Sequence, residues 1–315
     1  MSRNIIALDM GTTNTRAYLL DGKGNIIKTS KQNIGAGESA KCSSKQPIIN
    51  AVKTCIEELC NCENISAVIA SGMITSGLGL KEVPHLIAPV STEDIADNMV
   101  EGSYPEIADI PFWFVPGVKN NTDIDEEMDM MRGEETESVA LIERAQDAVY
   151  ILPGSHTKFV SVKGGVIESC LTTLTGELLA VITKDTVAAQ AVEHKFSDIR
   201  FFNKEYLLKG YNAAEKYGIA RAVFGTRILR VLSDVDANTA AWYLLGAVLQ
   251  GDITALKGAN LCSNTAVVAG KEPFVSAWKE LLEKERLFEN VIFDPNEIPL
   301  AAKGAYILAK HKNLI

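Results

Sequence analysis

The sequence contains no run of about 20 consecutive apolar residues, the length that a membrane-spanning helix needs. The apolar stretch near the N-terminus is interrupted by Asp9 after a few residues, so it is too short for the core of a secretory signal peptide. These absences favour a cytoplasmic protein and predict that no membrane is among its partners.

Basic residues are in the minority in this chain. It has 31 Lys and Arg residues against 40 Asp and Glu residues, which gives a formal net charge of -9. Binding to nucleic acid or to an anionic membrane surface needs clustered basic residues, so this balance argues against both kinds of partner. We therefore expect a small-molecule partner.

Cysteine and histidine are scarce and poorly spaced for metal binding. The six cysteines come without a secretory signal and are expected to be free thiols in a reducing compartment. Cys60 and Cys62, with Cys55 nearby, lack the second matched pair that a structural zinc site needs. None of the four histidines lies at a metal-ligand spacing from another. The sequence thus predicts neither a disulfide framework nor a metal held by protein ligands alone.

The chain is long enough, at 315 residues with 47% hydrophobic residues, to bury two cores. A strand, a polar turn, a strand, a hairpin and another strand occur in this order twice, over residues 5–29 and from residue 148 to residue 166 onward. The repeated order predicts two related lobes, residues 1–144 and 145–315, in which helices follow each small antiparallel unit. Gly304 lies inside the last expected helix and indicates a close helix contact, and this helix can pack back on the first lobe. The expected helices are 47–59, 174 onward, 211–232, 240–250, 273–283 and 299–310.

A first polar turn, residues 11–14 with the sequence Gly-Thr-Thr-Asn, follows an apolar strand that ends in Asp9. Small and hydroxyl-bearing residues leave backbone N–H groups open to close approach, as the phosphates of a nucleotide require. Magnesium binds through one or two carboxylates and bridges phosphate oxygens, which makes Asp9 a candidate Mg²⁺ ligand. The alternative is an ordinary strand-to-strand turn with a solvated aspartate.

A second polar turn, residues 153–157 with the sequence Pro-Gly-Ser-His-Thr, favours the nucleotide interpretation because two opposed turns can hold the phosphates of ATP. The chain has no G-x-x-x-x-G-K-[ST] string and no G-x-G-x-x-G after the first strand, which argues against a Walker loop and a dinucleotide site. The arrangement resembles the actin/hexokinase/heat-shock superfamily. That resemblance implies an α/β fold of two ribonuclease-H-like lobes, each with a mixed β-sheet flanked by helices, closing on a central nucleotide cleft.

A narrower resemblance covers most of the chain and points to the 2-dehydro-3-deoxygalactonokinase family. Its motifs stand here, in chain order, as ALDMGTTNTRAYLL, DMMRGEETE, ILPGSHTKFVSV, LTGELLAVI and VVAGKEPF. The joint occurrence of MRGEET and PGSHTKF is the most specific part. The resemblance implies an ATP-dependent kinase that phosphorylates the terminal hydroxyl of 2-dehydro-3-deoxy-D-galactonate to the 6-phosphate, in D-galactonate catabolism, with Mg²⁺.

The turns and the resemblance together assign roles to individual residues. The catalytic candidates are Asp9, which is also the metal ligand, Arg132 and His156. The residues expected to contact ATP are Gly11, Thr12, Thr13, Asn14, Gly154, Ser155, Thr157, Lys158 and Gly270. The residues expected to contact the sugar acid are Arg16, Ser71, Gly72, Met73, Glu134 and Glu135. The second lobe is expected to hold the adenosine pocket, and a homodimer is left open.

Several assignments have a second interpretation. Residues 123–137 are strongly acidic and fit a solvated helix, and we assign Glu137 to such a helix face. Arg132 differs because its guanidinium fork suits a carboxylate or a phosphate. Glu177 fits either a helix-start acid or a site acid, and His156 fits a residue that only stabilises its turn.

Other functions also fit the predicted fold, because a fold alone does not assign function. One is a kinase for another sugar or a polyol. Another is a non-catalytic nucleotide-binding regulator of the same superfamily.

Overall fold

The computed structural model describes residues 3–60, 64–259, 261, 263–295 and 297–315. It divides into two compact units. Unit 1 comprises Met1–Asp147, Val162–Cys170 and Asn296–Ile315, and unit 2 comprises Ala148–Ser161 and Leu171–Pro295. Cys62 and Cys262 lie outside the described residues, and the cysteines within them, namely Cys42, Cys55, Cys60 and Cys170, are free thiols.

Unit 1 is built on a six-stranded mixed sheet with the strand order β3-β2-β1-β4-β7-β6. Strand β1 pairs antiparallel with β2 and parallel with β4, so two types of pairing meet at β1. A small second sheet has the order β5-β8-β9. The strands are β1 (Asn4–Met10), β2 (Thr15–Leu20), β3 (Ile26–Gln32), β4 (Ile65–Gly72), β5 (Leu86–Ile87), β6 (Val100–Tyr104), β7 (Ala108–Phe114), β8 (Val118–Lys119) and β9 (Met130–Met131).

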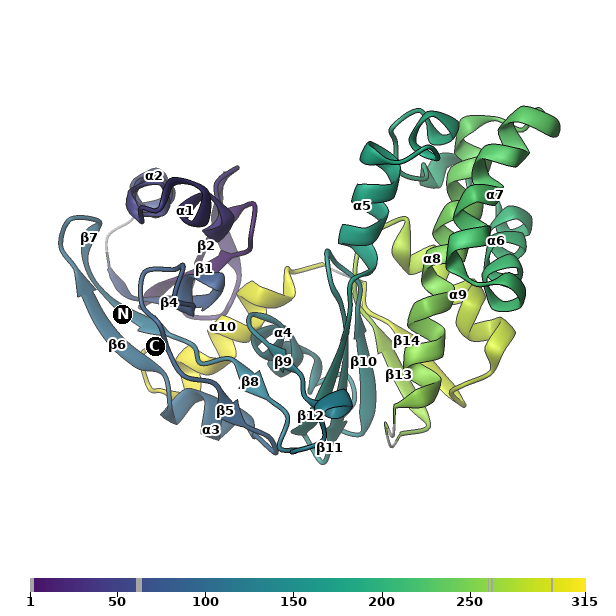
Figure 1. The fold of residues 1–315 in the computed structure, drawn as a ribbon. Coiled ribbons are helices and arrows are strands. Elements are labelled where there is room, and N and C mark those ends of the chain that lie inside the picture. Colours follow the sequence, from purple (N-terminus) through teal and green to yellow (C-terminus); the bar gives the residue numbers. More distant parts are fainter. Residues whose placement is uncertain (1–2, 61–63, 260, 262, 296) are drawn as a thin grey trace. The chain divides into compact units, whose positions relative to one another are not determined.

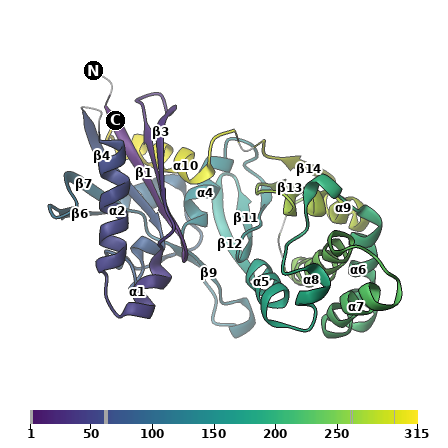
Figure 2. The same cartoon turned by 90° about the horizontal axis from the view of Figure 1, so that it is seen from above.

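Helices cover both faces of this sheet. Helices α1 (Ala36–Cys42) and α2 (Gln46–Leu59) lie on one side, and α4 (Glu134–Leu141) and α10 (Leu300–His311) lie on the other (Figure 2). Alternate residues of β1 face the two layers of helices, because successive side chains of a strand point to opposite faces of the sheet. Ile6, Leu8 and Met10 join the core with α2, whereas Asp9 belongs to the face of α4 and α10. A short helix, α3 (Thr92–Asp97), completes the unit.

Helix α10 packs closely on α4, as Gly304 predicted. A Cβ atom at Gly304 would lie 1.8 Å from the backbone oxygen of Thr136, so only glycine permits this crossing. The last helix therefore belongs to unit 1.

Unit 2 contains most of a five-stranded sheet with the order β12-β11-β10-β13-β14. The strands are β10 (Ala148–Leu152), β11 (Thr157–Lys163), β12 (Val166–Thr173), β13 (Thr265–Val268) and β14 (Asn290–Phe293). Its helices are α5 (Thr175–Asp185), α6 (Lys204–Tyr217), α7 (Ile219–Leu232), α8 (Ala237–Gly258) and α9 (Phe274–Glu285). The core includes Trp242 and Trp278, and Phe159 meets Trp278 edge-on at 5.7 Å between ring centroids.

The single helix expected over residues 211–232 is wrong. Gly218 has φ +80, a backbone conformation that favours glycine, and it ends α6 and begins α7. The helical spacing of the apolar residues continues across this break, so periodicity alone did not reveal it.

Both sheets use the same strand order. Three strands joined in sequence lie on one side, and a later strand pairs in parallel with the first of the three, β4 with β1 and β13 with β10 (Figure 1). The first sheet also has an antiparallel edge strand, β6. A helix, α1 or α5, follows each three-stranded segment. The predicted mixed α/β fold with a repeated motif is confirmed. None of the helices in the described ranges is both long and apolar enough to span a bilayer.

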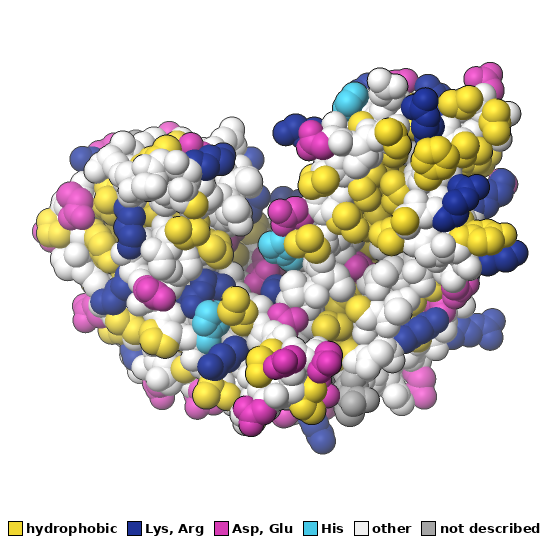
Figure 3. Space-filling view, viewed as in Figure 1, with side chains coloured by type: hydrophobic (Ala, Val, Ile, Leu, Met, Phe, Trp, Pro, Cys, Tyr) yellow, Lys and Arg dark blue, Asp and Glu magenta, His cyan; other side chains and the backbone are white. Residues whose placement is uncertain are grey.

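Unit 2 carries most of the large hydrophobic side chains that are exposed. Figure 3 shows them gathered over the part of this unit that contains α5, α6 and α7. They include Val181, Val187, Phe196, Phe201, Tyr217, Phe224, Val231 and Leu232.

Candidate functional site

The first polar turn connects β1 to β2 and is braced by the start of α1. The backbone oxygens of Gly11 and Thr12 accept hydrogen bonds from the N–H groups of Ala36 and Gly37, at 3.1 and 2.9 Å. A Cβ atom at Gly35 would lie 2.4 Å from the Gly11 oxygen, so the helix start lies directly against the turn. The side chains of Thr12 and Thr13 are exposed. The turn is thus held from behind and offers its hydroxyl groups to solvent.

Asp9 lies at the end of β1, opposite Arg16 of β2 in the sheet register. The Asp9 Oδ2 atom is 3.3 Å from an Arg16 terminal nitrogen, and the Asp9 side chain is 21% exposed. On the same face, burial and the negative charge of Asp9 raise the pKa of Tyr18. Asp9 is therefore a partly buried carboxylate with one cationic neighbour, rather than a solvated turn residue.

The segment from Ser71 to Thr75, called the Ser71–Thr75 loop, lies next to Asp9. It comprises the end of β4 and the turn that follows. Ser71 is buried and pairs with Asp9 in the parallel register, and Gly72 follows with φ +82. A Cβ atom at Gly72 would be 2.5 Å from the Met10 oxygen and 3.4 Å from Asp9 Oδ1. Met73, the third predicted residue of this loop, is half-buried. The structure thus places Ser71 and Gly72 beside Asp9, and Met73 packs against the core of unit 1.

Arg132 holds this loop in place through hydrogen bonds from its side chain. Its guanidinium group donates to the backbone oxygen and hydroxyl of Thr75 and to the backbone oxygen of Val83, the last at 2.9 Å, and it lies 3.2 Å from the His85 ring. The Thr75 hydroxyl in turn donates to the Gly72 oxygen at 3.1 Å. The fork of Arg132 therefore holds the loop in place within unit 1.

The first turn of α4 brings three carboxylates to the same area. A Cβ atom at Gly133, the residue before α4, would lie 3.2 Å from the Cα atom of Gly72. Glu134 accepts the Arg132 backbone N–H at 3.1 Å. Glu135 is fully buried, and both of its oxygens accept the Gly133 N–H, at 2.9 and 2.7 Å. Burial, with the neighbouring Glu134 charge, raises the pKa of Glu135 to about 7.

The assignment of Glu137 to a solvated helix face is wrong. The residue is half-buried, and burial followed by the charge of Asp9 raises its pKa to about 8. Glu137 lies in the first turn of α4, where the backbone N–H groups favour negative charge, yet its carboxylate shares one area with Asp9 and the other α4 acids. Its burial depends on how α4 packs on the sheet, which an acidic stretch of sequence does not show.

The second polar turn connects β10 to β11 in unit 2 and is braced by the start of α5. The N–H of Glu177 donates to the Ser155 oxygen at 2.8 Å. A Cβ atom at Gly176 would lie 2.2 Å from the Gly154 oxygen. His156 Nε2 and Glu177 Oε2 are 2.9 Å apart in a largely exposed pair. Glu177 is therefore a helix-start residue and a partner of the predicted site histidine at once.

Two residues at this turn that were expected to contact ATP have buried side chains. Thr157 is fully buried, and Lys158 is 6% exposed and donates to the Thr172 hydroxyl. Gly154 and Ser155 are exposed. The surface of the turn thus consists mainly of the Gly154 backbone and the side chains of Ser155 and His156.

A buried carboxylate that the sequence analysis did not single out lies beneath this turn. Asp252 of α8 is 3% exposed and accepts the hydroxyl of Thr175, and its pKa is raised to about 6 by burial. The available signal was a lone acid within the apolar segment of a 22-residue helix.

Gly270 follows β13 and lies against the second turn. A Cβ atom there would be 3.0 Å from the Pro153 ring. The structure thus brings this predicted ATP residue to the turn formed by Pro153 and Gly154.

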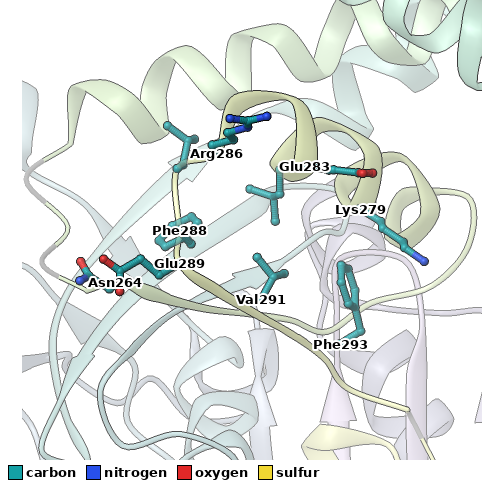
Figure 4. Close-up of a pocket in the computed structure, with 10 residues that line it drawn as sticks. Asn264, Lys279, Glu283, Arg286, Phe288, Glu289, Val291 and Phe293 are labelled. Atoms are coloured by element: carbon teal, nitrogen blue, oxygen red, sulfur yellow. The ribbon is translucent and has the colours of Figure 1, made fainter.

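A cavity of about 660 Å³ lies elsewhere in unit 2, between α9 and β14 (Figure 4). Neither the second turn nor Gly270 contributes to its lining. Its lining residues are Asn264, Lys279, Leu282, Glu283, Arg286, Leu287, Phe288, Glu289, Val291 and Phe293.

The carboxylate of Asp9 suits a magnesium ion that arrives with a nucleotide. Within the described ranges, no group of three or more His, Cys, Asp or Glu side chains is arranged to hold a metal. Mg²⁺ commonly binds through one or two carboxylates together with waters and substrate phosphates, and it does not need a complete protein cage. One partly exposed carboxylate beside a phosphate-type turn fits that mode.

Comparison with known proteins gives this geometry its context. The model of the 2-keto-3-deoxy-galactonokinase family matches residues 9–297. The chain belongs to this family. It is 23% identical over 257 residues to the 2-dehydro-3-deoxygalactonokinase of Escherichia coli strain K12, with 82% of each chain covered.

Solved structures agree on the fold. A Sinorhizobium meliloti crystal structure, titled as a candidate 2-dehydro-3-deoxygalactonokinase, superposes with a TM-score of 0.76 and covers 98% of this chain and 97% of its own, at 19% identity. Component A of the (R)-2-hydroxyglutaryl-CoA dehydratase of Acidaminococcus fermentans superposes with a TM-score of 0.52 at 13% identity. The match covers 98% of this chain and 99% of that one. At these identities the likeness shows the fold alone, which is of the actin/hexokinase type.

Membership in the 2-keto-3-deoxy-galactonokinase family makes the protein a phosphotransferase with an alcohol acceptor. Its substrates are a sugar acid and ATP. The two polar turns, the acidic first turn of α4 and the Ser71–Thr75 loop are the parts of the chain whose chemistry suits this reaction.

Proposed function

We propose that this kinase transfers the γ-phosphoryl group of ATP to the terminal hydroxyl of 2-dehydro-3-deoxy-D-galactonate and forms the 6-phosphate, as a step of D-galactonate catabolism. The observation that carries the proposal is the family match over residues 9–297, which includes both polar turns and the Arg132–Glu137 segment. The acceptor oxygen forms a bond to the γ-phosphorus, the bond from this phosphorus to the bridging oxygen breaks, and ADP leaves while the hydroxyl proton is released.

In this proposal each of the two polar turns binds phosphates of ATP. Both turns have their backbone oxygens or neighbouring glycines packed against a helix start, so little rearrangement is needed when a phosphate binds. Preorganised donors of this kind lower the barrier because they do not need to reorient during the reaction. Asp9 would hold Mg²⁺, which neutralises phosphate charge when bound.

The acceptor would bind in unit 1. Arg16 provides a positive charge beside Asp9 for the sugar acid carboxylate, and the loop from Ser71 to Met73 provides backbone groups. Arg132 supports the reaction by fixing this loop through Thr75. Phosphoryl transfer depends mostly on positioning and charge neutralisation, so such support affects the rate directly.

A panel of acceptors incubated with ATP and Mg²⁺ tests this proposal. We expect mass spectrometry to detect a singly phosphorylated 2-dehydro-3-deoxygalactonate, and no ATP consumption when the divalent cation is removed by a chelator. Phosphorylation of another sugar or polyol, with none of this acid, would refute the substrate and leave the kinase activity standing.

A further inference from the structure

The buried carboxylate of Asp252 lies under the second turn and has no place in the proposed chemistry. No salt bridge joins it to a cationic side chain in the part of the chain that the structure describes. It is 3% exposed, and its Oδ2 atom has no hydrogen-bond partner among the described residues. An unpaired carboxylate buried in this way destabilises a fold unless its surroundings compensate, so its position calls for an explanation.

Three threonine side chains surround Asp252. The hydroxyl of Thr175, the first residue of α5, donates to Asp252 Oδ1. The Thr173 and Thr175 hydroxyls are 2.9 Å apart and hydrogen-bonded to each other. The hydroxyls of Thr173 and Thr157 lie near enough to lower the pKa of Asp252, although Thr157 does not reach it in hydrogen-bond geometry.

These threonines belong to three segments, one at the end of the second turn and two that precede or begin the helix that braces it. Thr157 begins the strand that leaves the turn, Thr173 ends the strand before α5, and Thr175 begins α5. Helix α5 in turn braces the turn, because the Glu177 N–H bonds to Ser155 and Gly176 lies against Gly154. Asp252 thus connects α8 to the segments that set the conformation of residues 154–157.

We propose that Asp252 is a positioning residue that holds the second turn, through Thr175 and the start of α5, in the conformation that binds the phosphates of ATP. The inference rests on the proposed function. Asp252 itself does not touch the nucleotide, because α5 and the turn cover it.

Binding of ATP in the absence of a sugar tests the inference. The variants are Asp252→Asn, which keeps the shape and removes the charge, and Thr175→Val, which removes the hydroxyl donor. Thr183→Val is the matched control, because Thr183 is also a buried residue of α5 but donates to the Leu179 backbone oxygen. Isothermal titration calorimetry with Mg²⁺ and ATP gives Kd for each protein, and melting temperatures are recorded alongside.

We expect both test variants to bind ATP about tenfold or more weakly, which corresponds to about 1.4 kcal/mol. Thr183→Val and Thr175→Ser, which retains a hydroxyl, should bind within about twofold of the parent. In steady-state assays KM for ATP should rise about tenfold while kcat at saturating ATP changes little.

A purely structural role predicts a different pattern. Asp252→Asn and Thr175→Val would then melt earlier but bind ATP like the parent, and this result would overturn the inference while the proposed function stands. If Asp252→Asn does not fold, Thr175→Val decides alone. A parent protein that binds no ATP would overturn the inference and the proposed function together.

Discussion

In unit 1 the backbone oxygens of Gly11 and Thr12 accept hydrogen bonds from the start of α1, and in unit 2 the Ser155 oxygen accepts one from the start of α5. Gly35 and Gly176 are the residues that let the two helices come this close. The backbone arrangement is therefore repeated. The charged residues around the two turns differ. Under the proposed function, this difference gives the two turns different tasks.

Beside the first turn, Asp9 is partly exposed and paired with Arg16. Beneath the second turn, Asp252 is buried. Asp9 is 21% exposed and can reach a metal or a substrate, while Asp252 is 3% exposed and contacts only protein. Under the proposed function, both copies of the backbone motif would bind phosphate and the reacting carboxylate would belong to one copy. Changes at the exposed acid should affect turnover, and changes at the buried acid should affect nucleotide binding.

The largest expected effect follows replacement of Asp9. In Asp9→Asn the size is kept and the charge is lost, so kcat should fall about a hundredfold or more, corresponding to roughly 3 kcal/mol. The melting temperature should change little. The assay is kcat at saturating ATP across a magnesium titration, with Asp109→Asn, an exposed acid of β7, as control. A near-parental kcat at low magnesium would exclude the metal role.

A smaller effect is expected for Arg132→Lys. An ammonium group cannot donate at once to Thr75 and Val83 as the guanidinium does, so the loop beside Asp9 should lose its fixed position. We expect kcat/KM to fall about tenfold or more, or roughly 1.4 kcal/mol, together with a lower melting temperature. Arg200→Lys, at an exposed pair with Asp198, serves as the control. Parental kinetics with an unchanged melt would show that the loop does not depend on this fork.

Much of this account could be predicted from the sequence because it depends on local patterns. The repeated order of strands and turns, the strand that ends in Asp9 and the close contact at Gly304 were all predicted and are seen in the structure. Family motifs then identified the reaction class.

The remaining features depend on contacts between residues that are far apart in the sequence. Arg132 meets Thr75 and Val83, which precede it by 57 and 49 residues. Thr175, which donates its hydroxyl to Asp252, is 77 residues from it in the sequence. No local pattern shows that Glu137 is buried or that Arg132 binds backbone oxygens, because both follow from how the helices pack on the sheets.

A further expected effect concerns stability and its dependence on pH, with little consequence for turnover. Burial raises the pKa of Glu135 from 4.5 to about 7, so the folded state disfavours its charged form. The parent should therefore lose up to roughly 3 kcal/mol of stability through this group as the pH rises from about 4.5 through 7. Glu135→Gln should lose less than the parent, with the remaining loss coming from Glu137 and Asp252. Above pH 7 the variant should melt several degrees higher than the parent, at about 2–4 °C per kcal/mol.

Glu126→Gln, at an exposed acid, is the control for this comparison. Thermal melts between pH 5 and 9 without metal or nucleotide provide the measurement. Equal pH dependence in the parent and Glu135→Gln would contradict the raised pKa.

The central claim of the proposed function is that each of the two polar turns binds phosphates of ATP, and matched glycine substitutions test it most directly. Gly35→Ala and Gly176→Ala each place a Cβ atom within 2.4 Å of a turn oxygen, whereas Gly251→Ala adds one in open space within α8. The measurement is Kd for ATP with Mg²⁺, at a temperature where all four proteins are folded. We predict that the first two variants each bind about tenfold or more weakly and that Gly251→Ala binds like the parent. Parental affinity in either Gly35→Ala or Gly176→Ala would contradict the claim that its turn binds the nucleotide.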